Sequence, residues 1–182
     1  MNPGKLFFTI APARAGKSTF ANKWVCYQDG GTPSLEAFRP RTIVCADDIR
    51  LALHGMRYSS DAEEHVHAVK HTMIKALLKR GHDVLVDGTH TTWNSIEKLL
   101  WIDPHAEAIW IPNRELLYET ENTFEDFIQE LHKRAIRSGQ PDLIPIIDRM
   151  CQQFISLNTY YDRSRREFLE KWNARQNELR IV

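Results

Sequence analysis

The chain has little cysteine, no excess of charge of either sign and no long apolar run. Among its 182 residues, 24 Lys and Arg offset 24 Asp and Glu, so the formal net charge is zero. A general nucleic-acid coating protein is usually basic, so this balance disfavours that class without excluding a local basic groove. The three cysteines, Cys26, Cys45 and Cys151, form no CxxC pair and no even set, which favours a reducing compartment.

No stretch approaches the roughly 18 apolar residues of a membrane helix, and the apolar run at 6–11 is shorter than the core of a signal sequence. We therefore expect a cytoplasmic protein with no membrane partner. A hydrophobic content of 42% is enough for one sizeable core in a chain of this length. We predict a single domain over residues 1–182.

Short apolar runs alternate with helical patterns along the first two thirds of the chain. Strands are predicted at 6–11, 42–46, 83–87 and near 106–111, with helices running to residue 27, over 60–80 and over about 92–101. This alternation predicts an α/β fold of three layers, α/β/α, with a mostly parallel sheet. The rest reads as a helical lid over about 113–145, with a helix capped by Thr123, and a C-terminal helix over about 146–175 that Pro145 opens.

The helix predicted at 60–80 carries the clearest local signals. Ser60 and Glu63 have the spacing of a capping box, and Gly81 can end the helix. His67 and His71 are four residues apart, as two metal ligands on a helix would be, but no third ligand accompanies them. A polar helix face explains these histidines more simply.

The strongest motif is the segment Ala11-Pro-Ala-Arg-Ala-Gly-Lys17-Ser18, which matches the phosphate-loop pattern G-x-x-x-x-G-K-[ST] except at Ala11. An apolar strand precedes it and a helix follows, so backbone N–H groups can point at phosphate oxygens. Lys17 would lie between the β- and γ-phosphates, and the Ser18 hydroxyl would ligate Mg²⁺. We expect ATP or another nucleoside triphosphate to bind, with Mg²⁺, at Ala13, Arg14, Ala15, Gly16, Lys17, Ser18 and Thr19.

Alanine resists a positive φ, so the geometry at Ala11 decides whether this departure matters. If Ala11 ends the strand with ordinary dihedral angles, the loop is unharmed.

Asp47-Asp48-Ile49-Arg50 follows the second predicted strand, at the sheet edge where parallel α/β proteins bind ligands. A kinase of an alcohol needs a carboxylate that accepts the hydroxyl proton, and Asp47 is positioned for this at the end of the strand. Arg50 can grip an acceptor phosphate, and it shares a helical face with Asp47. For Asp48, capping of the following helix is the simpler explanation.

Lys133, Arg134 and Arg137 lie within five positions after a long acidic segment. Arg134 and Arg137 share a helical face and could stabilise charge on a transferring γ-phosphoryl group. A solvated basic helix end accounts for their spacing equally well.

The order of these motifs resembles the polynucleotide 5′-hydroxyl kinase family over about residues 5–150. The motifs are a strand followed by Gly-Lys-Ser-Thr, a strand followed by Asp-Asp-x-Arg, a strand followed by Asp-x-Thr, and a lid with Lys-Arg-x-x-Arg. The resemblance implies transfer of the γ-phosphoryl group of ATP to the 5′-hydroxyl end of DNA or RNA. It implies that Lys17 and Ser18 bind the nucleotide phosphates and Mg²⁺, that Asp47 is the general base and that Arg50 holds a phosphate of the acceptor. It also implies that Asp87 orients Arg50 or the acceptor, and it favours catalytic roles for Arg134 and Arg137.

Two other functions fit the same residues. One is a P-loop kinase of a different hydroxyl acceptor, such as a small molecule, a nucleoside or nucleotide, or a modified base within DNA. The other is a nucleotide-binding module without phosphoryl transfer. The sequence leaves open DNA against RNA, ATP against GTP, the oligomeric state and the role of Trp93, which, like Tyr58, could stack on a terminal base or simply pack in the core.

Overall fold

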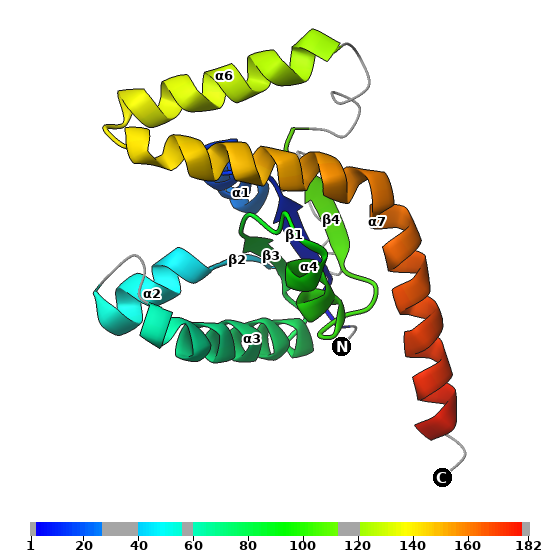
Figure 1. Cartoon of the computed structure of the whole chain (residues 1–182). Coiled ribbons are helices and arrows are strands. Elements are labelled where there is room, and N and C mark those ends of the chain that lie inside the picture. Colours follow the sequence, from blue (N-terminus) through cyan, green and yellow to red (C-terminus); the bar gives the residue numbers. More distant parts are fainter. Residues whose placement is uncertain (1–2, 27–39, 56–59, 113–120, 180–182) are drawn as a thin grey trace. The chain divides into compact units, whose positions relative to one another are not determined.

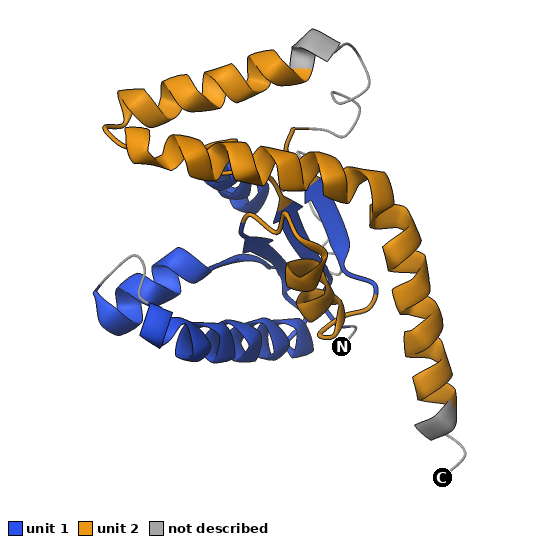
Figure 2. Cartoon of the chain, in the orientation of Figure 1, with its two compact units in different colours: residues 1–9, 16–88, 105–109 blue, residues 10–15, 89–104, 110–182 orange. Residues whose placement is uncertain are grey.

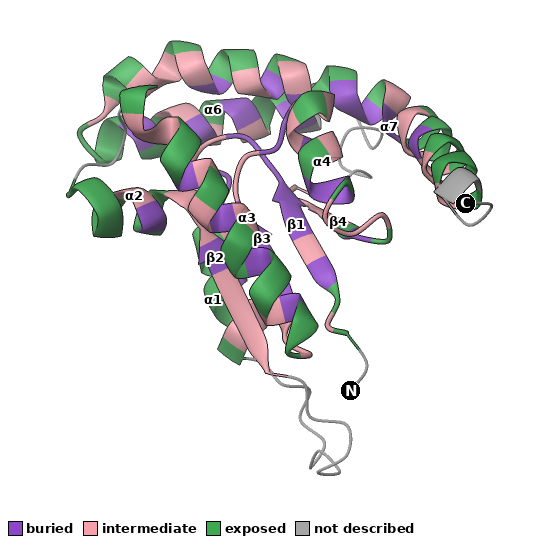
Figure 3. Ribbon diagram, turned by 90° about the horizontal axis from the view of Figure 1, so that it is seen from below, coloured by how far each residue is buried: buried purple, intermediate pink, exposed green. Residues whose placement is uncertain are grey.

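The computed structural model describes residues 3–26, 40–55, 60–112 and 121–179. Four strands form a parallel sheet in the order β2-β3-β1-β4 (Figure 1). The strands are β1 (Leu6–Ile10), β2 (Arg41–Cys45), β3 (Asp83–Asp87) and β4 (Glu107–Trp110). Each lies where a short apolar run predicts it, and β1 is buried along most of its length, as expected for a strand inside a parallel sheet (Figure 3).

The chain divides into two compact units (Figure 2). The first unit comprises residues 1–9, 16–88 and 105–109, and the second comprises 10–15, 89–104 and 110–182. The arrangement of one domain with a lid over 113–145 stays a prediction, and residues 113–120 of that lid lie outside the described residues.

In the first unit, helices cover the strands and pack on each other. Its helices are α1 (Lys17–Cys26), α2 (Ala46–His54), a short 3₁₀ helix η1 (Ser60–Ala62) and α3 (Glu63–Lys79). Helices α1 and α3 both contact β2 and β3 and lie on opposite sides of them, while α2 packs along α3 (Figure 1). The apolar core of this unit consists of side chains that are almost fully excluded from solvent, among them Leu6, Phe8, Val44, Val66, Ile74 and Leu85.

Two local predictions in this unit are wrong. The capping box is not formed, because α3 begins after Ala62 with no side-chain cap and Glu63 turns instead to Arg50. Strand β2 passes directly into α2, with Cys45 at the N-cap and no side-chain cap. Asp47 and Asp48 therefore lie inside the first helical turn, and neither residue caps the helix. Their negative charges still stabilise the helix by interacting with the positive end of its dipole.

The second unit is built on a helical hairpin. It contains α4 (Trp93–Leu100), α6 (Glu121–Arg137), a 3₁₀ turn η2 (Pro141–Leu143) and α7 (Ile144–Leu179). Helices α6 and α7 run side by side in opposite directions after a turn at Gly139, whose φ is +70° (Figure 1). Helix α6 begins at Glu121, so Thr123 lies within the helix and the predicted cap is wrong.

Apolar side chains that repeat at helical spacing along α7 form a core-packing surface. Ile147, Phe154 and Leu157 are fully buried. The indole of Trp110 packs edge-on against Phe154 and Tyr161, at ring-centroid separations of 5.2 and 5.3 Å. Helix α7 starts at Ile144, close to the predicted start, but it extends to Leu179. Among the helices that the structure describes, none has the length and apolar character that crossing a bilayer requires.

Candidate active site

The phosphate-loop segment connects β1 to α1, as the sequence predicts. Strand β1 ends at Ile10 and α1 begins at Lys17. Among described residues other than glycine, only Arg14 and His90 have a positive φ, so Ala11 keeps ordinary dihedral angles. Ala11 is fully buried, and its N–H donates to the Thr89 carbonyl over 2.9 Å. Alanine in place of the first glycine is therefore compatible with this loop.

Gly16 is needed for its backbone conformation. Its φ is +94°, a region that L side chains rarely adopt, and among the described residues none beyond its chain neighbours would lie within 4 Å of a Cβ at this position. The glycine thus allows the chain to turn into α1, whose first N–H groups have no helical partner. Such a helix start is suited to an anion.

Where the phosphate loop passes into α1, a side-chain hydroxyl is hydrogen-bonded to a carboxylate. The Ser18 hydroxyl, in the first turn of α1, donates to Asp87 Oδ2 over 2.9 Å. Asp87 ends β3 and is only 8% exposed. Mg²⁺ prefers hard oxygen ligands of this kind and keeps several waters or phosphate oxygens beside them. The Ser18–Asp87 pair therefore has the donor chemistry that a nucleotide-bound Mg²⁺ needs.

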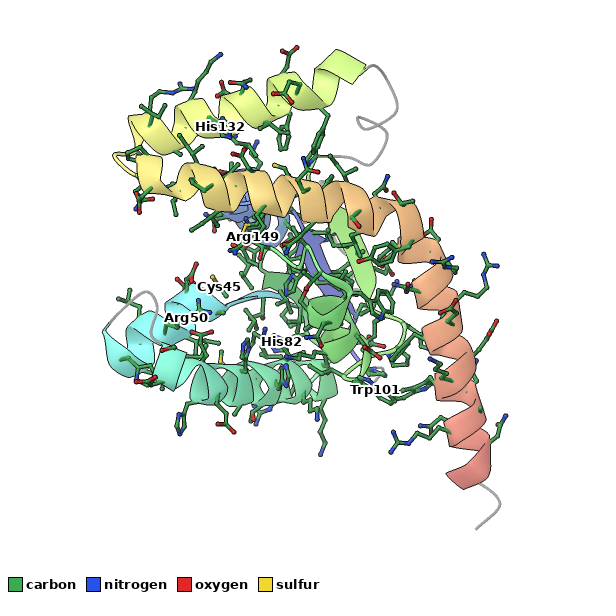
Figure 4. All side chains as sticks on the ribbon, in the orientation of Figure 1. Cys45, Arg50, His82, Trp101, His132 and Arg149 are labelled. Carbon is green, nitrogen blue, oxygen red and sulfur yellow. The ribbon has the colours of Figure 1, made fainter. Side chains whose placement is uncertain are left out.

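Arg50 is the centre of a second polar group, which the sequence predicts only in part. Arg50 lies on α2 (Figure 4). Its Nε and Nη2 donate to the two carboxylate oxygens of Glu63, over 2.5 and 2.7 Å, and its Nη1 pairs with Asp47. The side chains of Arg50 and Glu63 are 14% and 20% exposed, whereas that of Asp47 is 73% exposed. Asp47 is thus accessible to a substrate on one side while Arg50 holds it on the other.

The ion pair changes the protonation equilibria of both partners. The hydrogen bond from Arg50 lowers the pKa of the Glu63 carboxyl, and the same bond raises the pKa of the Arg50 guanidinium. Both groups are therefore fully charged near neutral pH. The bidentate, planar geometry is the strongest form of such a pairing and fixes the orientation of the guanidinium.

Strand register relates the two polar groups. Cys45 at the end of β2 lies opposite Asp87 at the end of β3, and Asp47 follows two residues later. Burial raises the pKa of the Cys45 thiol, and the charges of Asp87 and Asp48 raise it further, so acidic side chains surround this strand end. The Ser18–Asp87 pair and the Asp47–Arg50–Glu63 group therefore both belong to the carboxyl edge of the sheet in the first unit.

In the second unit, Arg134 and Arg137 have different surroundings. Arg134 Nη1 donates to the backbone carbonyl of Arg14 over 3.3 Å, and its Nε donates to Glu130. Arg137 donates to Glu130 and to the Lys133 carbonyl, both on its own helix. The hydrogen bond from Arg134 lowers the pKa of Glu130. Arg134 is thus the one of the two that contacts a phosphate-loop residue.

Arg14 anchors the phosphate-loop segment to the helical hairpin. Its φ of +66° is unusual for a residue with a side chain, and its guanidinium donates to Gln140 at the turn between α6 and α7. The sequence predicts nucleotide binding for Arg14 and no role for Gln140. No local pattern could have identified this contact, because it joins residues 126 positions apart.

The remaining candidates are the histidines of α3, Trp93 and Tyr58. No three or more His, Cys, Asp or Glu side chains among the described residues are placed to hold a metal ion, and His67 pairs instead with Glu63 over 3.8 Å. Trp93 packs edge-on against Tyr161, which is the packing role that the sequence left as an alternative. Tyr58 lies outside the described residues.

Comparisons with known proteins support the fold. A scan against protein-family models finds no match, and a search of curated proteins finds none either. Among solved structures, a chain of the Pnkp1/Rnl/Hen1 RNA repair complex matches with a TM-score of 0.63 and 19% identity, covering 86% of this chain and 45% of that one. A second structure of the Pnkp1/Rnl/Hen1 complex matches with a TM-score of 0.54 and 22% identity, covering 74% and 40%.

A third structure, the Mycobacterium tuberculosis APS kinase CysC Cys556Ala mutant, gives a TM-score of 0.44 at 16% identity, covering 60% of this chain and 75% of that one. The present chain spans less than half the length of the first two matched chains. At these identities the likeness concerns the fold. The chain has an α/β fold with a four-stranded parallel sheet flanked by helices, and it shares this fold with the matched chain of the RNA repair complex.

Proposed function

We propose that this protein is an ATP-dependent kinase that transfers the γ-phosphoryl group to the 5′-hydroxyl end of DNA or RNA. The observation that carries the proposal is the Asp47–Arg50 pair, one strand away from the Ser18–Asp87 pair at the carboxyl edge of the sheet. An accessible carboxylate beside a phosphate loop is what phosphoryl transfer to an alcohol needs. The similar fold of a protein from an RNA repair complex is consistent with this function.

The donor side of the reaction belongs to the phosphate loop. Residues Ala13–Thr19 would hold the triphosphate through backbone N–H groups at the start of α1, and Lys17 would add a positive charge. The oxygens of Ser18 and Asp87 would hold Mg²⁺, directly or through water. When bound, Mg²⁺ neutralises charge on the β- and γ-phosphates. Arg134, which contacts the carbonyl of Arg14, would stabilise negative charge on the transferring group.

The acceptor side belongs to Asp47 and Arg50. The 5′-hydroxyl oxygen attacks the γ-phosphorus, and a new P–O bond forms as the bond between that phosphorus and the β–γ bridging oxygen breaks. Asp47 accepts the hydroxyl proton, and ADP leaves with the electron pair of the broken bond. Arg50 orients the carboxylate of Asp47, and its guanidinium would donate a hydrogen bond to a phosphate that neighbours the reacting nucleoside.

Transfer of labelled γ-phosphate to a 5′-hydroxyl oligonucleotide in the presence of Mg²⁺ tests the proposal. Asp47→Asn keeps the shape of the side chain but removes the base, so we expect transfer to fall by about 10²- to 10⁴-fold while ATP affinity is retained. Asp48→Asn is the matched control, because Asp48 is the exposed neighbour in the same helical turn, and it should keep near-normal activity. Full activity of Asp47→Asn would show that the base has been assigned wrongly.

Two observations favour a second candidate, a P-loop kinase of a small hydroxylated acceptor. The net charge of the chain is zero, and acidic side chains surround the end of β2, neither of which favours a long polyanion. Competition for labelled phosphate among an oligonucleotide, nucleosides and small polyols separates the two functions. ATP binding without transfer to any acceptor would instead support a nucleotide-binding module.

A further inference from the structure

The guanidinium of Arg50 is already neutralised in the protein. Glu63 binds it through two hydrogen bonds and Asp47 through a third, so two carboxylates surround one positive charge. Arg50 is mostly buried, which limits screening of these charges by water. An acceptor phosphate that approaches Arg50 therefore meets a group whose net charge is negative.

Other charged side chains act on parts of this group. On α3, Lys70 and His67 act on Glu63, and Lys70 adds a positive charge there. Asp48, in the same helical turn as Asp47, and Asp87, at the end of β3, act on Cys45 at the end of β2. The carboxylates that act on Arg50 itself are those of Glu63 and Asp47.

We propose that Glu63 is a positioning residue that makes the enzyme select acceptors by the charge of their phosphate. The enzyme uses a 5′-hydroxyl nucleoside whose neighbouring phosphate is a monoanionic diester in preference to one whose phosphate is a dianionic monoester. This inference rests on the proposed function. Glu63 orients Arg50 toward Asp47, and its negative charge makes the second charge of a terminal monoester unfavourable. The acceptor that fits is the 5′-terminal nucleoside of a nucleic-acid chain, whose neighbouring phosphate is a diester, rather than a mononucleotide.

Two small acceptors isolate this effect. A nucleoside 3′-monophosphate and its 3′-(methyl phosphate) ester share the nucleoside and the 5′-hydroxyl, and they differ by one methyl group and one negative charge. At about pH 8 we expect kcat/KM to be at least about tenfold higher for the methyl ester, mainly through a lower KM. A monoester phosphate takes up its second proton with a pKa of about 6, so the preference should shrink toward about pH 5.5.

The variant Glu63→Gln removes the charge and keeps the shape. We expect the preference for the methyl ester to fall at least about fivefold and to lose its pH dependence, while kcat for both acceptors decreases because Arg50 loses its bidentate anchor. Glu64→Gln, an exposed neighbour on the same helix, should behave as the wild type.

The outcomes are distinguishable. If the wild type uses both acceptors equally or prefers the monoester, or if Glu63→Gln and Glu64→Gln give the same ratio, the inference about Glu63 is wrong while the proposed function stands. If neither these acceptors nor a 5′-hydroxyl oligonucleotide receives phosphate, the proposed function itself fails, and the inference fails with it.

Discussion

Replacing Glu63 by Gln should destabilise the protein in a pH-dependent way. The substitution removes one partner of a mostly buried ion pair and leaves Arg50 with Asp47 and a neutral amide. Hydrogen bonds to charged groups contribute about 1.5–3 kcal/mol, and exposed ion pairs about 0–1 kcal/mol. Because the amide oxygen can keep one of the two bonds, we expect a loss of about 1–2 kcal/mol in the free energy of unfolding near pH 7. For a chain of this size that corresponds to a Tm lower by about 2–8 °C.

The sign of the pH dependence follows from the pKa of Glu63, which the folded protein lowers below its ordinary value. The native state then binds fewer protons than the unfolded state, so the stabilisation is fully present above the ordinary pKa of about 4.3 and is lost as the pH falls through the lower native pKa. Urea unfolding of the wild type, Glu63→Gln and the control Glu64→Gln should show the full difference near pH 7 and a progressively smaller difference as the pH falls below about 4. An equal effect of the two variants near pH 7, or an undiminished difference in acid, would refute this account.

Three further predictions follow from individual contacts. Ser18→Ala should raise the Mg²⁺ concentration needed for half-maximal phosphoryl transfer by at least about tenfold, because it removes one oxygen donor; an unchanged Mg²⁺ titration would exclude this role. Arg134→Gln should lower kcat by about a hundredfold or more and Arg137→Gln by much less, since only Arg134 contacts a phosphate-loop residue; equal losses would contradict that ranking. With a thiol reagent near pH 8, exposed Cys26 should react quickly and buried Cys151 only after unfolding, because burial raises the pKa of Cys151 to about 12; rapid native labelling of Cys151 would contradict its placement.

The strands and the phosphate loop could be predicted because their signals are local. A run such as Asp83–Asp87 is apolar within, short and bounded by turn residues, and a buried parallel strand needs nothing more. The same holds for Gly16-Lys17-Ser18, whose position between a strand and a helix follows from the neighbouring residues. The apolar stripe on α7 was predictable for the same reason, since its members repeat at helical spacing.

The role of Glu63 could not be predicted in this way. Its spacing from Ser60 indicates a capping box, and nothing in the neighbouring sequence favours a different partner. The partner that prevails, Arg50, is 13 residues away on another helix. A cap is worth about 1 kcal/mol, whereas a mostly buried bidentate pair with a guanidinium is worth more, so tertiary packing decides between them. The start of α2 at Ala46 was missed because a strand that turns into a helix without a loop leaves no turn residue in the sequence.

The conformation of the phosphate loop shows which positions of the motif carry a backbone requirement in this chain. The pattern has glycine at its first and sixth positions, yet Ala11 occupies the first position with an ordinary φ and a hydrogen bond from its N–H to the Thr89 carbonyl. The positive φ angles fall on Arg14 and Gly16. A side chain at Arg14 costs about 1 kcal/mol in this conformation, and its contact with Gln140 offsets part of that cost. The positive φ angles that shape the loop therefore lie at Arg14 and Gly16, and the first position of the motif does not need one. For this reason the missing first glycine does not disqualify the segment as an anion-binding loop.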